Sequence, residues 1–242
     1  MTGERPRYLA IDLARTAALA GMVVFHFCYD LEIFGWLPQG TVVTGWFWWQ
    51  ARIVAGSFIF LAGLGLWLAQ GKGVRPRAFL HRLARIAAAA ALVTLATRLA
   101  MPGLTIFYGI LHSIAVSSVL GLLFLRLPAP VTVLAAAAVA ILPQIWSNPA
   151  LGGWLVWIGL SGTVPITADF EPLFPWFAPF LLGIATGRGL SHFGLWPALD
   201  WPATPLLRRL AWPGQHSLAI YLIHQPVLFG AVFAFTWVWW RL

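Results

Sequence analysis

The sequence predicts an all-α, polytopic integral membrane helix bundle. Of its 242 residues, 60% are apolar and 9% are charged, whereas an ordinary soluble domain has about 25% charged residues. Several apolar runs approach the 20 or so residues that an α-helix needs to cross a bilayer. Many of the 15 Trp residues stand near the ends of these runs, as in the aromatic belts at membrane interfaces. We therefore expect a single membrane domain over residues 1–242.

Seven runs are candidates for membrane-spanning helices. They cover residues 8–29, 46–70, 79–100, 105–126, 129–147, 173–190 and 215–239. Residues 151–163 contain an apolar stretch that is too short to span, so we expect an interfacial or re-entrant segment there, with an eighth crossing as the alternative. Residues 191–213 contain four prolines and are predicted to form a loop.

The distribution of basic residues favours a cytoplasmic N-terminus. If the seven runs all cross the membrane, eleven Lys and Arg side chains fall on the side of the N-terminus, and Arg98 and Arg241 fall on the other. Cytoplasmic loops are the ones enriched in Lys and Arg, so these residues are topology signals before they are evidence for nucleic-acid binding. The eleven are Arg5, Arg7, Lys72, Arg75, Arg77, Arg82, Arg85, Arg126, Arg188, Arg208 and Arg209.

The first run carries ionisable residues along one face of its predicted helix. At about 100° per residue, Asp12, Arg15, His26 and Asp30 lie within one stripe, and Arg15 and His26 are separated by about 16 Å of helical rise. A charge at mid-membrane costs about 2.5–3.5 kcal/mol. We therefore expect this stripe to face the bundle interior or a water-filled cavity, and we take His26 as a functional candidate. Asp12 and Arg15 also have a simpler explanation as a mutual ion pair.

Further polar residues lie inside other apolar runs. His112 in the fourth run and His224 in the seventh are candidates either for chemistry or for hydrogen-bonded structural roles. Arg52 is near the outer end of the second run, where it is expected to extend to the interface or to pair with Asp30 or Glu32.

The sequence gives no signal for a metal site or a disulfide. Cys28 is the one cysteine, so an intrachain disulfide is excluded; the thiol is either a small buried side chain or an acyl carrier. The histidines lack the spacing of a known metal-binding motif such as HExxH.

Several stretches, in order, resemble known membrane acyltransferases. Arg15 followed by His26 is similar to a signature of the acyltransferase-3 superfamily, although Thr16 stands where a glycine commonly follows the arginine. The wider set resembles the heparan-α-glucosaminide N-acetyltransferase-type family and its small bacterial members. The stretches are IDLARTAALAGMVVFHFCYDLEIFG, GSFIFLAGLGLWLA, TLATRL with IFYGILHSIAV, DFEPLFPWFAPFLLGIATGR, and GQHSLAIYLIHQPVL.

The resemblance implies a transmembrane acetyltransferase in a bacterial inner membrane. Acetyl-CoA would be the donor on the cytoplasmic side, and an amine or hydroxyl, expected to belong to a sugar, the acceptor on the outer side. A neutral imidazole can accept the proton of the attacking group. The implied catalytic residues are His26, Asp30, His112 and His224, with Asp30 orienting the His26 ring. Coenzyme A phosphates are expected to bind the basic side chains of Arg15, Lys72, Arg75, Arg77, Arg82 and Arg85.

A proton-coupled transporter is the alternative function, because buried charges and histidines also suit a proton relay. Such carriers commonly show inverted repeats, and this sequence has no evident internal repeat. The sequence leaves open whether acetyl passes directly or through an acetyl-histidine. Small-residue helix faces would also support a homodimer.

Overall fold

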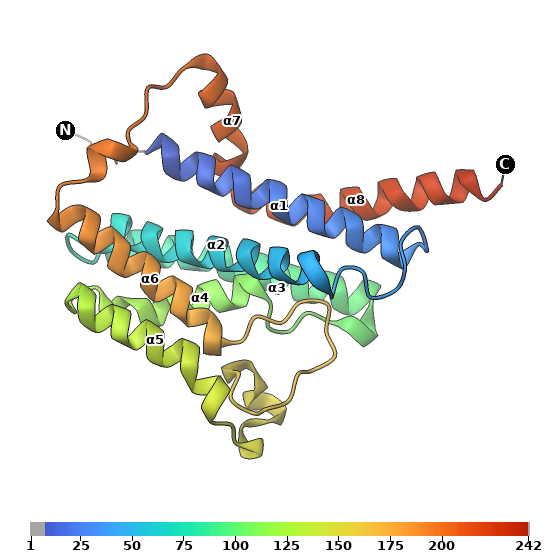
Figure 1. The fold of residues 1–242 in the computed structure, drawn as a ribbon, viewed down its shortest axis with the longest axis horizontal. Coiled ribbons are helices and arrows are strands. Elements are labelled where there is room, and N and C mark those ends of the chain that lie inside the picture. The colour runs from blue at the N-terminus through green and yellow to red at the C-terminus, as the bar shows by residue number, and fades with distance from the viewer. Residues whose placement is uncertain (1–7, 242) are drawn as a thin grey trace. The chain divides into compact units, whose positions relative to one another are not determined.

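The computed structural model describes residues 8–241 and is helical throughout its regular parts (Figure 1). Within these residues the β-structure is limited to an isolated bridge between Tyr108 and Phe170. The α-helices are α1 (Leu9–Ile33), α2 (Gly45–Gln70), α3 (Pro76–Ala100), α4 (Ile110–Phe124), α5 (Ala129–Ile145), α6 (Leu173–His192), α7 (Pro205–Gln215) and α8 (Ser217–Trp239).

Each of the seven predicted runs forms a helix, which confirms the all-α class. Four of them, α1, α2, α3 and α8, are long and apolar enough to cross a membrane. The helices α4 and α5 are apolar but have only 15 and 17 residues. The predicted start of the fourth run at residue 105 is five residues too early, because α4 begins only after Gly109. Arg5 and Arg7, used for the orientation, lie outside the described residues.

Residues 151–163 do not form an eighth crossing. They contain a six-residue 3₁₀ helix, Gly153–Ile158, which at about 2 Å per residue is far shorter than a bilayer core of about 30 Å. The prediction of a loop over residues 191–213 is wrong in its last part, where α7, an 11-residue helix with Arg208 and Arg209 on its exposed surface, begins at Pro205 and ends at Gln215.

The chain divides into two compact units, and the boundary falls inside α2. Unit 1 contains residues 8–57 and 196–241 of the described chain, and unit 2 contains residues 58–195.

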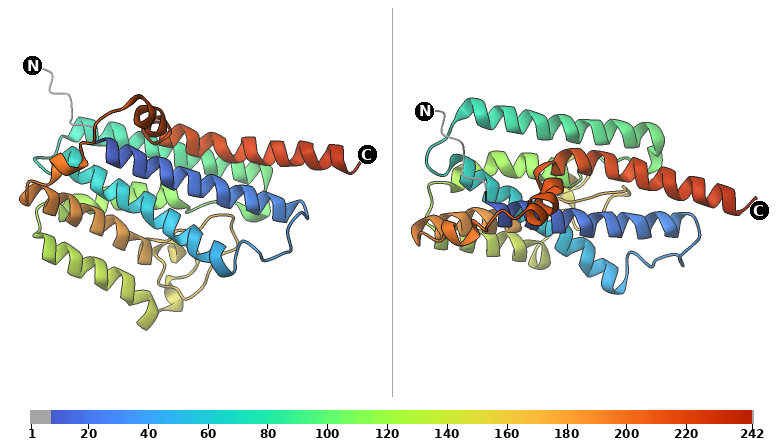
Figure 2. Two further views of the ribbon diagram at one scale, coloured as in Figure 1. Left: turned by 45° about the horizontal axis from the view of Figure 1, so that its top comes forward. Right: turned by 90° about the horizontal axis from the view of Figure 1, so that it is seen from above.

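Unit 1 is organised around α1. The helices α7 and α8 both pack against it, and α8 runs beside α1 in each view (Figures 1 and 2). Two hydrogen bonds support this packing: the Gly214 N–H donates to Thr16 Oγ1 (2.9 Å), and Trp36 Nε1 donates to Thr236 Oγ1 (2.8 Å). The first part of α2 is also joined to α1, since Gln50 Nε2 donates to the Gly21 carbonyl (2.7 Å).

The loop that follows α1 is hydrogen-bonded to a single carboxylate, that of Glu32. Glu32 accepts the backbone N–H groups of Gly40 (2.8 Å) and Val42 (2.9 Å), and its carbonyl accepts from Gln39. This carboxylate therefore holds the loop in place. The Arg52 guanidinium lies over the Trp48 ring, 3.5 Å from its centroid, and the pairing of Arg52 with Asp30 or Glu32 stays a prediction.

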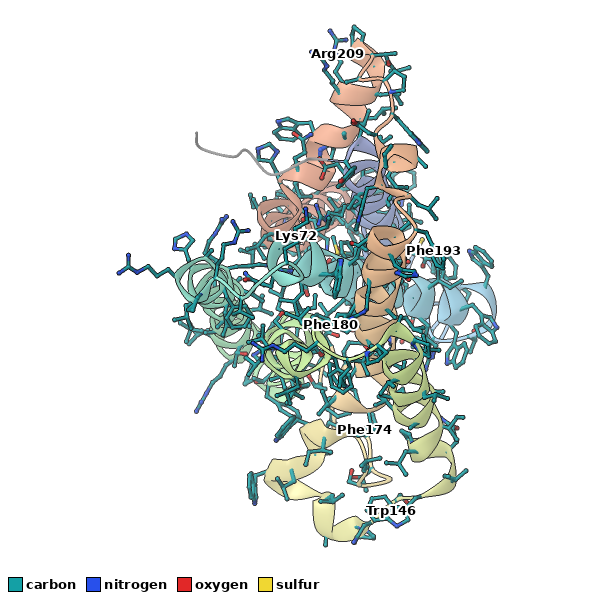
Figure 3. All side chains as sticks on the ribbon, turned by 90° about the vertical axis from the view of Figure 1, so that its left-hand side faces the viewer. Lys72, Trp146, Phe174, Phe180, Phe193 and Arg209 are labelled. Carbon is teal, nitrogen blue, oxygen red and sulfur yellow. The ribbon has the colours of Figure 1, made fainter. Side chains whose placement is uncertain are left out.

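Unit 2 is built on α6, which packs against α4 and α5. Phe180 and Leu181 of α6 are fully buried, and Figure 3 shows Phe180 among side chains in the middle of this unit and Phe174 at the start of the helix. The second half of α2 crosses α6 with the two backbones almost in contact. A Cβ added at Gly63 would overlap the Phe180 carbonyl, and one added at Gly183 would overlap the Phe60 carbonyl.

We expect Gly183→Ala to destabilise unit 2 by about 1–3 kcal/mol, because the added methyl group must push two helix backbones apart. The matched control is Gly189→Ala on the same helix, where an added Cβ meets nothing within 4 Å and a small gain from helix propensity is expected. Thermal unfolding in detergent measures both. Equal melting temperatures for the two variants would contradict the close crossing.

Candidate functional site

The clearest cluster of buried polar groups in unit 1 lies between α1 and α8. His26 and Asp30 stand one turn apart on α1, and His224 and Gln225 are adjacent on α8. The rings of His26 and His224 are in edge contact, with centroids 4.9 Å apart and planes at 64°. Gln225 Nε2 donates a hydrogen bond to Asp30 Oδ1 at 2.8 Å. The two helices thus bring together three of the four predicted catalytic residues.

Four buried polar atoms of this cluster lack a hydrogen-bond partner within the described residues: His26 Nδ1, Asp30 Oδ2, His224 Nε2 and Gln225 Oε1. A buried polar atom left without a partner costs about 1–3 kcal/mol, and native proteins have few of them. Four in one cluster indicate a site where substrate or water supplies the missing partners.

The proton position on His224 follows from its surroundings. Nδ1 lies 2.6 Å from the Tyr221 carbonyl oxygen, and a carbonyl only accepts, so Nδ1 carries a proton. In the neutral ring, Nε2 then has a free lone pair. His224 is therefore held in the tautomer that a general base requires.

The sequence led us to expect that Asp30 orients the His26 ring, but the structure shows Asp30 bonded to a different residue. Its side chain is fully buried and its bound oxygen accepts from Gln225 on α8; no hydrogen bond joins it to His26 in the described chain. No local sequence pattern indicates a role for Gln225, because its contact with Asp30 joins residues 195 positions apart.

Arg15 belongs to a separate polar group nearer the start of α1. Its Nη1 lies 3.1 Å from Asp12 Oδ1, so these two residues do form the ion pair that was the simpler explanation. The Arg15 side chain keeps 29% of its surface exposed, whereas that of Asp12 keeps only 3%. The Arg15 side chain is therefore partly exposed, and that of Asp12 is buried.

His112, the fourth predicted catalytic residue, lies in unit 2 and has both ring nitrogens in hydrogen bonds. The Gly109 N–H donates to Nδ1 (3.3 Å), so in the neutral ring Nε2 carries the proton. Nε2 lies 3.2 Å from Thr94 Oγ1, whose hydroxyl donates to the Ile106 carbonyl at 2.7 Å. His112 would have to break one of these bonds to move a proton, and its catalytic role stays a prediction.

Asp169 joins the same region and was not predicted as a site residue. Its Oδ2 accepts the Ile110 N–H at 3.0 Å, so the carboxylate lies at the N-terminus of α4, where helix dipoles favour negative charge. Burial raises the pKa of the Asp169 carboxyl, although the Ile110 N–H acts in the opposite direction. Gly109 is required here, because a Cβ at this position would overlap the Asp169 carboxylate.

The remaining predicted ligand residues lie at one end of unit 2, around the α2–α3 connection. Figure 3 labels Lys72 in this connection. Lys72, Arg75, Arg77 and Arg85 are exposed, and Arg82 is half-buried and donates to the Ala62 carbonyl at 3.3 Å. Exposed cations this close in sequence suit an anionic ligand or lipid headgroups.

Comparison with protein families identifies the chain. The model of the catalytic region of heparan-α-glucosaminide N-acetyltransferase matches residues 7–226. The chain belongs to this family. Comparisons with curated proteins and with solved structures gave no match.

Family membership makes the chain a membrane acetyltransferase, as predicted. The match covers His26, Asp30 and His112, and it ends at residue 226, immediately after His224 and Gln225. The α1–α8 cluster is thus inside the family's catalytic region, whereas most of the second half of α8 is outside it.

We expect His112→Ala to lower the free energy of unfolding by about 1–3 kcal/mol, since it leaves the Gly109 N–H without a partner and removes the ring N–H that donates to the Thr94 hydroxyl. The control is His81→Ala, at an exposed position of α3. Chemical or thermal unfolding measures the difference. If His112→Ala unfolds like the wild type but loses acetyl transfer, the residue is catalytic and the network is not its main role.

Proposed function

We propose that this family member transfers an acetyl group from cytoplasmic acetyl-CoA to an amine or hydroxyl, expected on a sugar, at the outer face of a membrane. The proposal includes a single bundle of seven spanning helices with a cytoplasmic N-terminus, as the basic residues favour. A bacterial inner membrane is the proposed location. The transporter alternative gains no support from family membership and is not proposed.

The contact between the His26 and His224 rings carries this proposal. Two imidazole rings with centroids 4.9 Å apart cannot both be in the positively charged imidazolium form without strong repulsion, so the pair is suited to carry a single extra proton. The acceptor nitrogen or oxygen attacks the thioester carbonyl, and its proton passes to an imidazole. The resulting imidazolium then protonates the departing CoA sulfur, which balances the reaction.

His26 is proposed as the proton acceptor, with His224 as its partner in the shared site. His224 has an unpaired Nε2 in a fixed tautomer, so it can take the proton from His26 or from the acceptor directly. The competing route is covalent. In it the imidazole itself attacks the thioester to form an acetyl-histidine, and the acceptor then attacks this intermediate and takes the acetyl group. The buried Asp30 carboxylate would stabilise the positive charge that either route places on a ring.

Coenzyme A is proposed to bind through the basic residues of α1 and of the α2–α3 connection. Its phosphates need several cations, and Lys72, Arg75, Arg77 and Arg85 are exposed. Arg82 is proposed to contribute from its half-buried position, and Arg15 from beside its ion pair with Asp12. Arginine suits phosphate because its planar fork of donors matches two oxygens at once.

We expect His26→Ala to lose acetyl transfer by about a hundredfold or more, the contribution of a general base, while it still binds CoA. Removing the ring leaves the acceptor proton without a receiving group. The measurement is acetyl transfer from radiolabelled acetyl-CoA to amino sugars, with thermal stabilisation by CoA as the folding and binding control. His81→Ala serves as the matched histidine variant. Near wild-type transfer by His26→Ala would refute its role.

We expect Arg77→Glu with Arg85→Glu to weaken CoA binding by about tenfold or more, because each change replaces a favourable charge by an unfavourable one. The control is Arg98→Glu, an exposed arginine at the other end of the same helix. Binding is measured for CoA and for 3′-dephospho-CoA at fixed ionic strength, since exposed charges are screened by salt. Equal affinities in the wild type, the double variant and Arg98→Glu would exclude Arg77 and Arg85 from the phosphate site.

A further inference from the structure

Gln225 lies beside the proposed catalytic histidines and makes one contact that defines its role. Its Nε2 donates to Asp30 Oδ1 at 2.8 Å, and this bond joins α8 to α1. A carboxylate accepts only, so the amide nitrogen must face Asp30 and the amide oxygen must face away. The side-chain orientation of Gln225 is therefore determined by Asp30.

The same bond also limits what Asp30 can do. One of its oxygens is held by Gln225, and the other, Oδ2, is buried without a partner within the described residues. Without Gln225, Asp30 could rotate toward the histidine one turn before it on α1. The amide thus keeps one carboxylate oxygen available for a group that the protein does not supply.

The titratable groups around Asp30 in unit 1 are few. On its own helix they are His26, Tyr29 and Glu32, and α8 contributes His224 and Tyr221, whose rings are in contact with centroids 5.7 Å apart. The loop over residues 34–44 contains no titratable side chain, and the first part of α2 contains Arg52, whose guanidinium lies over Trp48. Gln225 is neutral, so it fixes the direction of the carboxylate without adding a proton-binding group.

We propose that Gln225 is a positioning residue for acetyl transfer. It holds Asp30 so that Oδ2 faces the acceptor group or the imidazolium formed in the reaction, and it prevents Asp30 from binding the imidazole directly. This inference rests on the proposed function, and it adds a residue of α8 that neither the sequence pattern nor family membership assigned. Gln225 does not itself touch the reacting atoms.

Three variants distinguish a positioning role of Gln225 from a purely structural hydrogen bond between α1 and α8. Gln225→Leu removes the donor at similar volume. Gln225→Glu replaces it by a second carboxyl facing Asp30, and two adjacent carboxyls share one proton. The double variant Asp30→Asn with Gln225→Glu keeps a hydrogen bond between the helices but moves the carboxylate to α8. Gln144→Glu, at an exposed position of α5, controls for added charge.

The experiment measures kcat, KM for acetyl-CoA and the pH dependence of transfer, with melting temperature as the folding readout. We expect Gln225→Leu to lower kcat by about tenfold to a hundredfold, as for a misplaced group, with KM within about twofold because the donor site is untouched. Gln225→Glu should move the acidic limb of the pH profile upward by about one unit or more. The double variant should be folded and nearly inactive, and Gln144→Glu unchanged.

Several outcomes would overturn the inference. One is a wild-type kcat and pH profile in both Gln225→Leu and Gln225→Glu. Another is a fall in melting temperature with unchanged kcat per folded molecule, because this result shows that the bond between Gln225 and Asp30 only stabilises the fold. Full activity of the double variant would show that the bond matters and the place of the carboxylate does not. A wild-type protein that binds CoA yet transfers no acetyl group would instead refute the proposed function, and with it the premise of this inference.

Discussion

Ionisable side chains inside apolar helices are costly unless they find partners, and this constraint shapes both units. In unit 1, Asp30 is bonded by an amide and Asp12 by Arg15. In unit 2, His112 is bonded through both nitrogens. Each solution uses a different chemistry, but each joins groups that would otherwise be buried alone. Function is expected where such pairing is incomplete.

The three histidines differ in how many of their ring nitrogens are hydrogen-bonded. This difference distinguishes a structural histidine from those suited to proton transfer. His112 has no nitrogen left to accept a proton without breaking a bond. His224 has one nitrogen held by the Tyr221 carbonyl and one lone pair available. His26 contacts His224 by its ring edge and has a buried Nδ1 without a partner. The α1–α8 cluster therefore combines a fixed geometry with unused proton-binding capacity, as catalysis requires.

The sequence predicted the helices well because apolar runs and loop charges are local signals. It also predicted that His26, Asp30 and His224 are candidates, since each is polar within an apolar run. It did not assign Gln225 a role or predict the contact of Asp169 with Ile110, because those depend on partners 195 and 59 positions away. The late start of α4 has a similar cause: residues 104–108 are bonded to the segment before α6, which includes Ala168 and Glu171.

The close crossing of α2 and α6 within unit 2 restricts how these helices can move. Both backbones meet where glycines remove the side chains. A slip of α2 by one helical turn would bring Ile59 or Trp67 against the Phe180 carbonyl, where no side chain fits. The two helices thus have one permitted register, and sliding between them is excluded as a source of conformational change.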